Sequence, residues 1–174
     1  RHSDIKIPSP MYGPESVNKL PYMPVKEAIS KYPRILSGTK HKKIPNHECR
    51  KLSNTNLKRL KHIKKNGGLR DTLPQELILE CHKNYKGHKD VYGRMELNNP
   101  APTLTCKCTS ISNGRFGHPT QNRGISVREA ATLQTFKDNY VFYGGITETT
   151  AWVGNAVPVR FAENLGRVFI KNGH

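Results

Sequence analysis

The chain has 174 residues, of which 34% are hydrophobic, and it carries 29 Lys and Arg against 13 Asp and Glu, a net charge of +16. This composition supports one modest core and, without a long apolar run, argues against a membrane-spanning protein. Four cysteines in a chain of this length do not make a disulfide scaffold. We therefore expect a cytoplasmic setting with reduced thiols.

Most of the positive charge lies in residues 31–70, which hold 13 Lys and Arg and the single acid Glu48, a net +12. A block of this density attracts polyanions, because Lys and Arg neutralise phosphate groups. It predicts a nucleic-acid site. A solvated, partly disordered basic face is the alternative that charge alone leaves open.

Residues 1–24 are rich in proline and have no sustained hydrophobic period, so they predict an extended connector that leads into a short helix at 25–29. A second helix is expected from Ser53, with Leu57, Leu60 and Ile63 on its apolar side. The opposite side is cationic and consists of Lys58, Arg59, Lys61 and Lys64. Asn66, Gly67 and Gly68 predict the end of this helix.

Between residues 90 and 112 the sequence favours small antiparallel strands. Leu104, Cys106 and Cys108 alternate with threonines, although Pro100 and Pro102 interrupt the pattern. A tight glycine-bearing loop at 113–119 follows. It presents the side chains of Arg115 and His118.

Ser126 and Glu129 have the spacing of a capping box, so a helix should begin there. Gln134 falls on the side of this helix that is otherwise made of small apolar residues. A buried amide that braces a loop is one interpretation of Gln134, and direct ligand contact is the other. Pro158 suits the first turn of a final helix with an apolar stripe of Phe161, Ala162, Leu165, Val168 and Phe169.

The four cysteines offer no clear metal site. Cys106 and Cys108 are separated by one residue, whereas structural zinc sites usually begin with a pair separated by two to four residues. Cys49 and Cys81 each have a neighbouring histidine but do not complete that spacing. We therefore expect no bound metal.

Five sequence blocks resemble the C-terminal half of bacterial DNA cytosine-5 methyltransferases and occur in the same order. The resemblance spans roughly residues 20–170. The blocks are Asp-Val-Tyr-Gly-Arg-Met at 90–95, Pro-Ala-Pro-Thr-Leu-Thr at 100–105, Gly-Arg-Phe-Gly-His-Pro at 114–119, Arg-Gly-Ile-Ser-Val-Arg-Glu-Ala-Ala-Thr-Leu-Gln-Thr-Phe at 123–136, and Gly-Asn-Ala-Val-Pro at 154–158.

In that family a large Rossmann-like domain binds S-adenosylmethionine and carries the chemistry, and a smaller target-recognition domain lies across the DNA cleft. The resemblance implies an α+β fold: a small mixed lobe with short antiparallel strands and several helices, without the Rossmann-like catalytic domain. It also implies three parts. Residues 1–30 are a connector from the catalytic domain, 31–125 the target-recognition domain, and 126–174 the C-terminal helices that dock on the catalytic domain.

Cytosine-5 methylation needs a thiolate and an acid, because the flipped base must be attacked at C6 before C5 can accept the methyl group. The family supplies them from a Pro-Cys dipeptide and a Glu-Asn-Val tripeptide, and a Gly-rich loop binds the donor. None of the three occurs in these 174 residues. We expect no catalytic residue in this chain and no activity from it alone.

The resemblance assigns further roles residue by residue. Gly154, Asn155 and Ala156 would line the donor pocket, although Asn155 could equally cap a helix. The family commonly has Gln and an aliphatic residue before this block, where this chain has Trp152 and Val153. Because of that departure, the contact with the cofactor is less well supported than the block itself.

On the DNA side, Thr103 and Leu104 resemble the pair whose hydroxyl holds a backbone phosphate near the flipped base; simple strand residues are the alternative. The expected groove contacts are Arg94, Arg115 and His118, since Arg can bind guanine in bidentate fashion. The residues expected to be structural are Ser126, Arg128, Glu129 and Gln134.

The resemblance thus implies the DNA-binding, target-recognition portion of a DNA (cytosine-5-)-methyltransferase from a restriction-modification system. Its parent would transfer a methyl group from S-adenosylmethionine to a flipped cytosine. The implied partners are double-stranded DNA and the N-terminal catalytic domain, in the bacterial cytoplasm and without a membrane. The alternatives are a stand-alone, non-catalytic DNA-binding module and a basic RNA-binding protein. The RNA alternative is weaker because residues 31–70 offer one aromatic, Tyr32, for base stacking.

Overall fold

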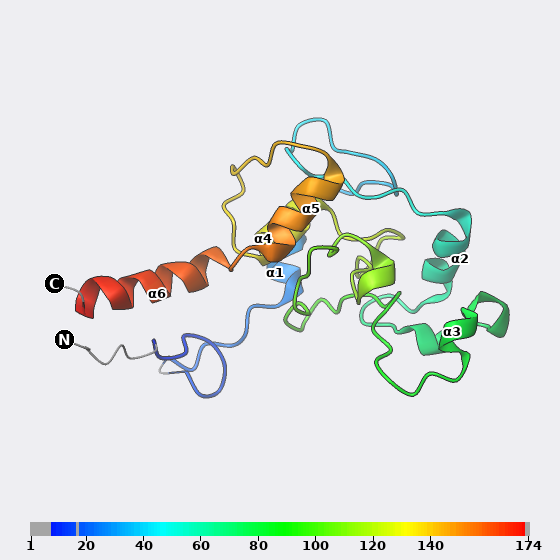
Figure 1. Cartoon of the computed structure of the whole chain (residues 1–174), viewed down its shortest axis with the longest axis horizontal. Helices are drawn as coiled ribbons and strands as arrows, with labels where there is room; N and C mark the ends of the chain where they lie inside the picture. Colours follow the sequence, from blue (N-terminus) through cyan, green and yellow to red (C-terminus); the bar gives the residue numbers. More distant parts are fainter. Residues whose placement is uncertain (1–7, 17, 173–174) are drawn as a thin grey trace.

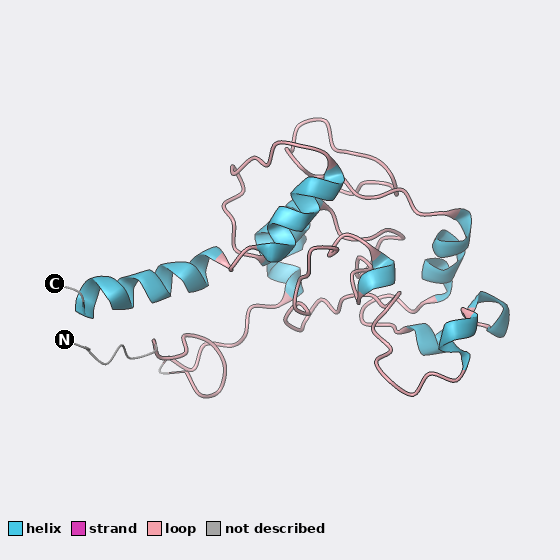
Figure 2. Cartoon of the chain, in the orientation of Figure 1, coloured by secondary structure: helices cyan, strands magenta, loops and turns pink. Residues whose placement is uncertain are grey.

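The computed structural model describes residues 8–16 and 18–172. The first seven residues of the predicted connector, residue 17 and the last two residues lie outside them. The described elements are α1 (Val25–Ile29), α2 (Asn54–His62), η1 (Arg70–Thr72), η2 (Gln75–Leu77), α3 (Glu80–Lys83), η3 (Ile111–Asn113), α4 (Val127–Leu133), α5 (Ile146–Asn155) and α6 (Val159–Asn172). Long loops connect these helices (Figures 1 and 2).

The predicted helix starts are confirmed. α1 occupies the expected range, and the Ser53 side chain accepts a hydrogen bond from the Asn56 amide at the start of α2. Both halves of the capping box form at α4: the Glu129 amide donates to the Ser126 hydroxyl, and the Ser126 amide donates to the Glu129 carboxylate. α2 ends at His62, earlier than the expected glycines, because Ile63 adopts an extended conformation.

The α+β prediction is wrong. Within the described residues no strand forms, and the β-type pairings are isolated bridges, such as Arg94 with Gly117 and Gly117 with Gly124. The expected alternation fails after Thr105, where the chain closes into turns through the bond from the Cys108 amide to the Thr105 carbonyl. Pro100 and Pro102 add to this, because proline has no N–H to donate to a ladder.

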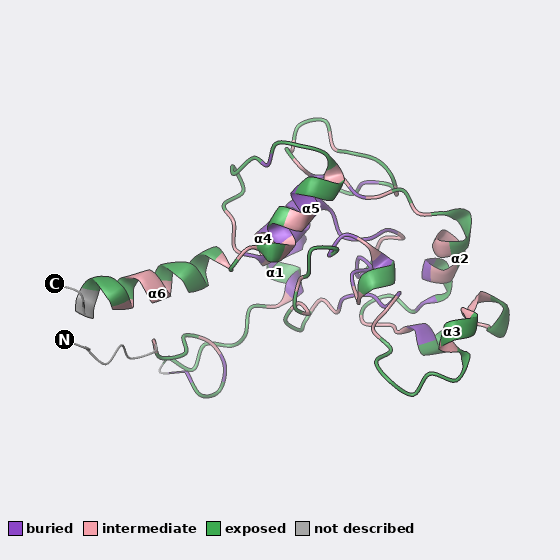
Figure 3. Ribbon diagram, in the orientation of Figure 1, coloured by how far each residue is buried: buried purple, intermediate pink, exposed green. Residues whose placement is uncertain are grey.

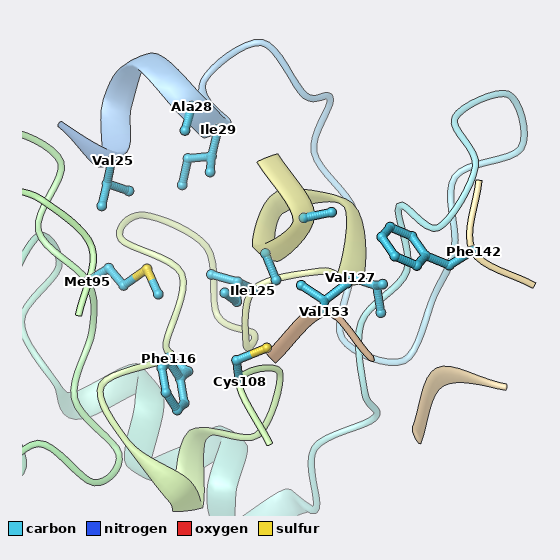
Figure 4. Close-up of a cluster of buried hydrophobic side chains, with 12 residues drawn as sticks. Val25, Ala28, Ile29, Met95, Cys108, Phe116, Ile125, Val127, Phe142 and Val153 are labelled. Carbon is cyan, nitrogen blue, oxygen red and sulfur yellow. The ribbon is translucent and has the colours of Figure 1, made fainter. Parts of the chain in front are cut away.

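The main core joins segments that are distant in the sequence. α1, α4 and α5 supply Ala28, Ala130 and Val153, while loop residues complete the cluster with Met95, Cys108, Phe116 and Ile125 (Figure 4). Side chains from residues 95–125 therefore pack directly against α4 and α5. The main core thus contains residues from both sides of the expected domain boundary at residue 125. Ile63, Leu73, Tyr92 and Ile111 form a smaller cluster, and Leu77 of η2 packs against it.

α6 projects from the body on the same side as residues 8–24, and α2 and α3 lie at the opposite end (Figure 1). Several apolar residues of α6 are exposed: Phe161 is 54% exposed, Phe169 55% and Ile170 78%. Figure 3 shows much of α6 in the colour of exposed residues. None of the described helices is long and apolar enough to cross a membrane.

Buried arginines connect the loops. Arg94 is fully buried, and all five of its N–H donors are used by the carbonyls of Leu60, Ile63, His118 and Gln121 and by the Asn122 side chain. These acceptors come from two separate loop regions and the end of α2. Because loop carbonyls have no ladder to bind, a buried guanidinium satisfies groups that would otherwise remain unpaired.

A buried ion pair stands at the start of α4. Arg123 donates two hydrogen bonds of 2.7 Å to the Glu129 carboxylate, and both residues are 1% exposed. Burial raises the pKa of Glu129, but the hydrogen bonds and charge of Arg123 outweigh it, so the net shift is downward. His118 lies beside this pair, and burial lowers its pKa to about 4.

The pH dependence of stability tests this arrangement. Because the His118 pKa falls from 6.5 to about 4 on folding, the unfolded chain binds a proton that the folded chain does not. The free energy of unfolding should therefore decrease as the pH drops, by about 2 kcal/mol between pH 6.5 and pH 5. Urea unfolding at both pH values measures it. His118→Gln should remove the part of this decrease that His118 contributes and leave the part from the buried His47, whose pKa burial also lowers. His62→Gln, at an exposed position, should leave the whole decrease intact. An unchanged decrease in His118→Gln would contradict the assignment.

Candidate functional site

A groove of about 630 Å³ lies between residues 8–12 and 22–24, residues 100–104 and the junctions of α4, α5 and α6. Its lining is mainly apolar and includes Tyr12, Tyr22 and Met23 from the connector and Phe161 from α6. Sequence reasoning missed these connector residues. The available signal was the presence of two tyrosines and two methionines in a segment otherwise dominated by proline.

The groove brings together two of the sequence blocks. Thr103 and Leu104 line one wall, and Gly154 and Ala156 line another. Thr103 is exposed and Leu104 half-buried, so the hydroxyl is accessible from solvent. Asn155 is exposed and does not contribute to the lining.

Gly154 sets the distance between these two walls. A Cβ atom at this position would stand 1.9 Å from the Thr105 carbonyl oxygen and 2.6 Å from the Cys106 nitrogen. The backbone of α5 therefore lies directly on the backbone of the 103–106 segment. This close approach gives Gly154 a packing reason that is independent of any cofactor.

Gln134 braces the same junction. Its side-chain amide donates to the carbonyls of Val153 and Ala156, at 3.0 and 2.9 Å, and its backbone carbonyl accepts from the Val159 amide. These bonds hold the end of α5 and the start of α6 against α4. The side-chain N–H groups of Gln134 are thus engaged within the protein.

Arg128 is also engaged within the protein. Its guanidinium donates to the carbonyls of Pro45, Lys137 and Tyr140 and to the Asn46 side chain. It is fully buried. The loop at residues 137–140 is therefore attached to α4 through this side chain.

The basic residues in α2 and just after it divide into two groups. Lys58, Lys61 and Lys64 are exposed. Arg59 is instead tied inward, because it donates to the Leu77 carbonyl and the Asn56 side chain and lies 5.3 Å from the centre of the Tyr92 ring. The three lysines remain accessible to a polyanion.

Two residues that were expected to contact a groove of the DNA, Arg94 and His118, are instead buried in the protein. Arg94 is buried and its five donors are all occupied, so it has none for a base. His118 is 5% exposed, and its Nδ1 accepts from the amides of Thr120 and Gln121. Arg115 differs, since a third of its side chain is exposed and it lies 3.4 Å from the Asp90 carboxylate.

No described cysteine is placed as a nucleophile. Burial raises the pKa of Cys108 to about 12 and also raises that of Cys49. Cys81 and Cys106 are exposed, and none of the four lines the groove. Among the residues that the structure describes, no three His, Cys, Asp or Glu side chains gather as a metal site would need.

A strongly basic chain with accessible lysines has the features of a nucleic-acid-binding protein. Comparison with known proteins is more specific. Residues 11–171 match the family model of C-5 cytosine-specific DNA methylases, and the chain belongs to this family.

Its relatives are both bacterial and plant proteins. The chain is 42% identical to the type II methylase M.HgiDII of Herpetosiphon aurantiacus, over 97% of the chain and 46% of the relative. It is 36% identical to DNA (cytosine-5)-methyltransferase 3 of Arabidopsis thaliana, over 82% of the chain and 12% of the relative. It is 31% identical to the type II methyltransferase M.NgoFVII of Neisseria gonorrhoeae, over 97% and 43%. The chain thus spans less than half of each.

Two glycine substitutions test the packing of the groove. Gly154→Ala should destabilise the fold, because the new methyl group would overlap the Thr105 carbonyl. Gly166→Ala is the matched control on α6, where no atom lies within 4 Å of the new Cβ. It should stabilise the helix by about 0.4–1 kcal/mol. Thermal unfolding of both variants measures the effects, and equal stability would contradict the close approach at Gly154.

Proposed function

We propose that this chain is the DNA-binding part of a cytosine-5 DNA methyltransferase and that it completes the active site of a catalytic region not contained in these residues. The single observation that carries the proposal is the groove, whose lining brings Thr103 and Leu104 together with Gly154 and Ala156. Fifty residues separate the two pairs in the sequence. Membership of the methylase family supports this interpretation.

The proposed division of labour follows from the chemistry. S-adenosylmethionine supplies the methyl group, and the thiolate that attacks the flipped cytosine comes from the catalytic region. In this chain, Gly154 and Ala156 offer a close-packed wall to the donor. The exposed Thr103 hydroxyl offers a hydrogen bond to a backbone phosphate near the flipped base. Residues 31–125 would face DNA, and Arg115 is the remaining candidate for contact with a base.

The surface available to the catalytic region is apolar. This surface consists of the exposed apolar residues of α6 and the lining of the groove, and Phe161 belongs to both. Burying a side chain of this size stabilises an interface by about 1.5–3 kcal/mol. We therefore expect residues 126–174 to dock on the catalytic region. A role in restriction and modification agrees with the type II names of the bacterial relatives.

Complementation tests the proposal. The chain alone should neither transfer methyl groups nor bind S-adenosylmethionine stoichiometrically, because its groove supplies only part of a donor site. Adding the catalytic half of a related methylase, with its Pro-Cys and Glu-Asn-Val blocks, should restore transfer to duplex DNA. The same half with its catalytic cysteine replaced by alanine is the control. Tight donor binding by this chain alone in calorimetry would contradict the proposal.

The exposed lysines in α2 and just after it give a second test. If Lys58, Lys61 and Lys64 contact phosphates, replacing all three with glutamine should reduce the slope of log K against log salt by up to about 3, since each contact contributes about 0.9. Fluorescence anisotropy with a duplex at several salt concentrations measures the slope. The control removes the same charge elsewhere, at Lys19, Lys137 and Arg167. If the two triple variants show the same slope, α2 does not face the DNA.

A further inference from the structure

Arg70 differs from the other buried arginines of the described chain. Arg94 fills all five donors, Arg123 pairs with Glu129, and Arg128 donates to four acceptors. Arg70 is 7% exposed, yet among the described residues it donates one hydrogen bond, of 2.8 Å, to the His88 carbonyl. It makes no ion pair with a described carboxylate. Arg70 therefore keeps donors that no described protein group accepts, and these donors are open to solvent, since none of them is a buried unpartnered atom.

The surroundings of Arg70 are open and positively charged. It lines both an enclosed hollow of about 80 Å³ and an open hollow of about 340 Å³, and His82 and Tyr85 line both as well. Its guanidinium lies 5.4 Å from the centre of the Tyr85 ring, which orients the plane of the donors. The acid nearest in sequence, Asp71, lines the enclosed hollow and is engaged by Lys89 at 3.5 Å.

The hollow continues toward the basic helix. Arg59 of α2 lines the enclosed hollow, and α2 also carries the exposed Lys58 and Lys61. Burial lowers the pKa of His82, and the charges of Arg70 and Arg59 lower it further. The positive charge of the hollow comes from Arg70, Arg59 and Lys89, of which Lys89 faces Asp71. This end of the molecule lies opposite α6, where the catalytic region would dock (Figure 1).

We propose that Arg70, oriented by Tyr85, binds a phosphate of the DNA backbone. The proposal rests on the DNA-binding function proposed above and adds an anchoring site at the end remote from the groove. A guanidinium suits this ligand, because its planar donors match two phosphate oxygens at once. The contact positions the duplex and reads no sequence.

Duplex binding by the chain tests the site. Arg70→Gln should reduce the slope of log K against log salt by about 1, equally for duplexes of unrelated sequence. Arg70→Lys should retain the slope but bind more weakly, because an ammonium is a point charge. Arg167→Gln, which removes the same charge from α6, should change neither slope nor affinity. Thermal unfolding establishes that the variants remain folded. A slope in Arg70→Gln equal to that of the unchanged chain would overturn the proposal.

A second experiment uses inorganic phosphate as the ligand and does not depend on DNA binding. Phosphate should raise the unfolding midpoint of the unchanged chain above that in chloride of equal ionic strength, and the difference should vanish in Arg70→Gln. NMR of the unchanged chain should show the Arg70 Nε–H resonance shifting with phosphate. If the chain binds phosphate at Arg70 but no duplex, only the DNA-binding function fails. If it binds duplex but Arg70 responds to neither ligand, only the Arg70 site fails.

Discussion

The carboxylate of Glu129 binds three parts of the chain at one point. It accepts two hydrogen bonds from Arg123 and one from the Ser126 amide, and the Ser126 hydroxyl in turn contacts the buried His47. This one group therefore fixes the start of α4, the loop before it and the loop around residue 47. Removing either charge would leave the other buried and unpaired, which typically costs 3–5 kcal/mol. The groove depends on this point, because α4 carries Gln134 at its end.

Buried arginines in this fold donate hydrogen bonds to backbone carbonyls that a β-sheet would otherwise pair. A chain with long loops leaves many backbone carbonyls without a helix or ladder partner, and buried carbonyls require one. Arg94 and Arg128 donate to carbonyls from segments that no regular element connects. The positive charge of the chain consequently serves two purposes. Some of its cations hold the interior together, and the exposed lysines of α2 and the hollow at Arg70 remain available to phosphate groups.

The proposed functions occupy opposite ends of the molecule. The groove and the exposed apolar side of α6 lie at one end, and α2, α3 and Arg70 at the other (Figure 1). An apolar surface suits a permanent contact with the catalytic region, since burying it releases water from hydrocarbon. A cationic surface suits DNA, because phosphate contacts release counterions and adjust with salt. The main core, in which α1, α4 and α5 pack against loop residues, lies between the two ends (Figure 1).

The sequence by itself determined the local features and the family. The Ser126 cap, the short helix at 25–29 and the blocks that identify a cytosine-5 methylase depend on neighbouring residues, which a linear reading contains. It did not determine which polar residues are buried. Arg94 and Arg115 belong to similar glycine-bearing blocks, yet one has five protein acceptors and the other is partly exposed. The expected strands failed for the same reason, because a ladder needs a partner segment that only the folded chain can supply. Burial and hydrogen-bond satisfaction depend on residues distant in sequence, and tertiary structure alone brings those together.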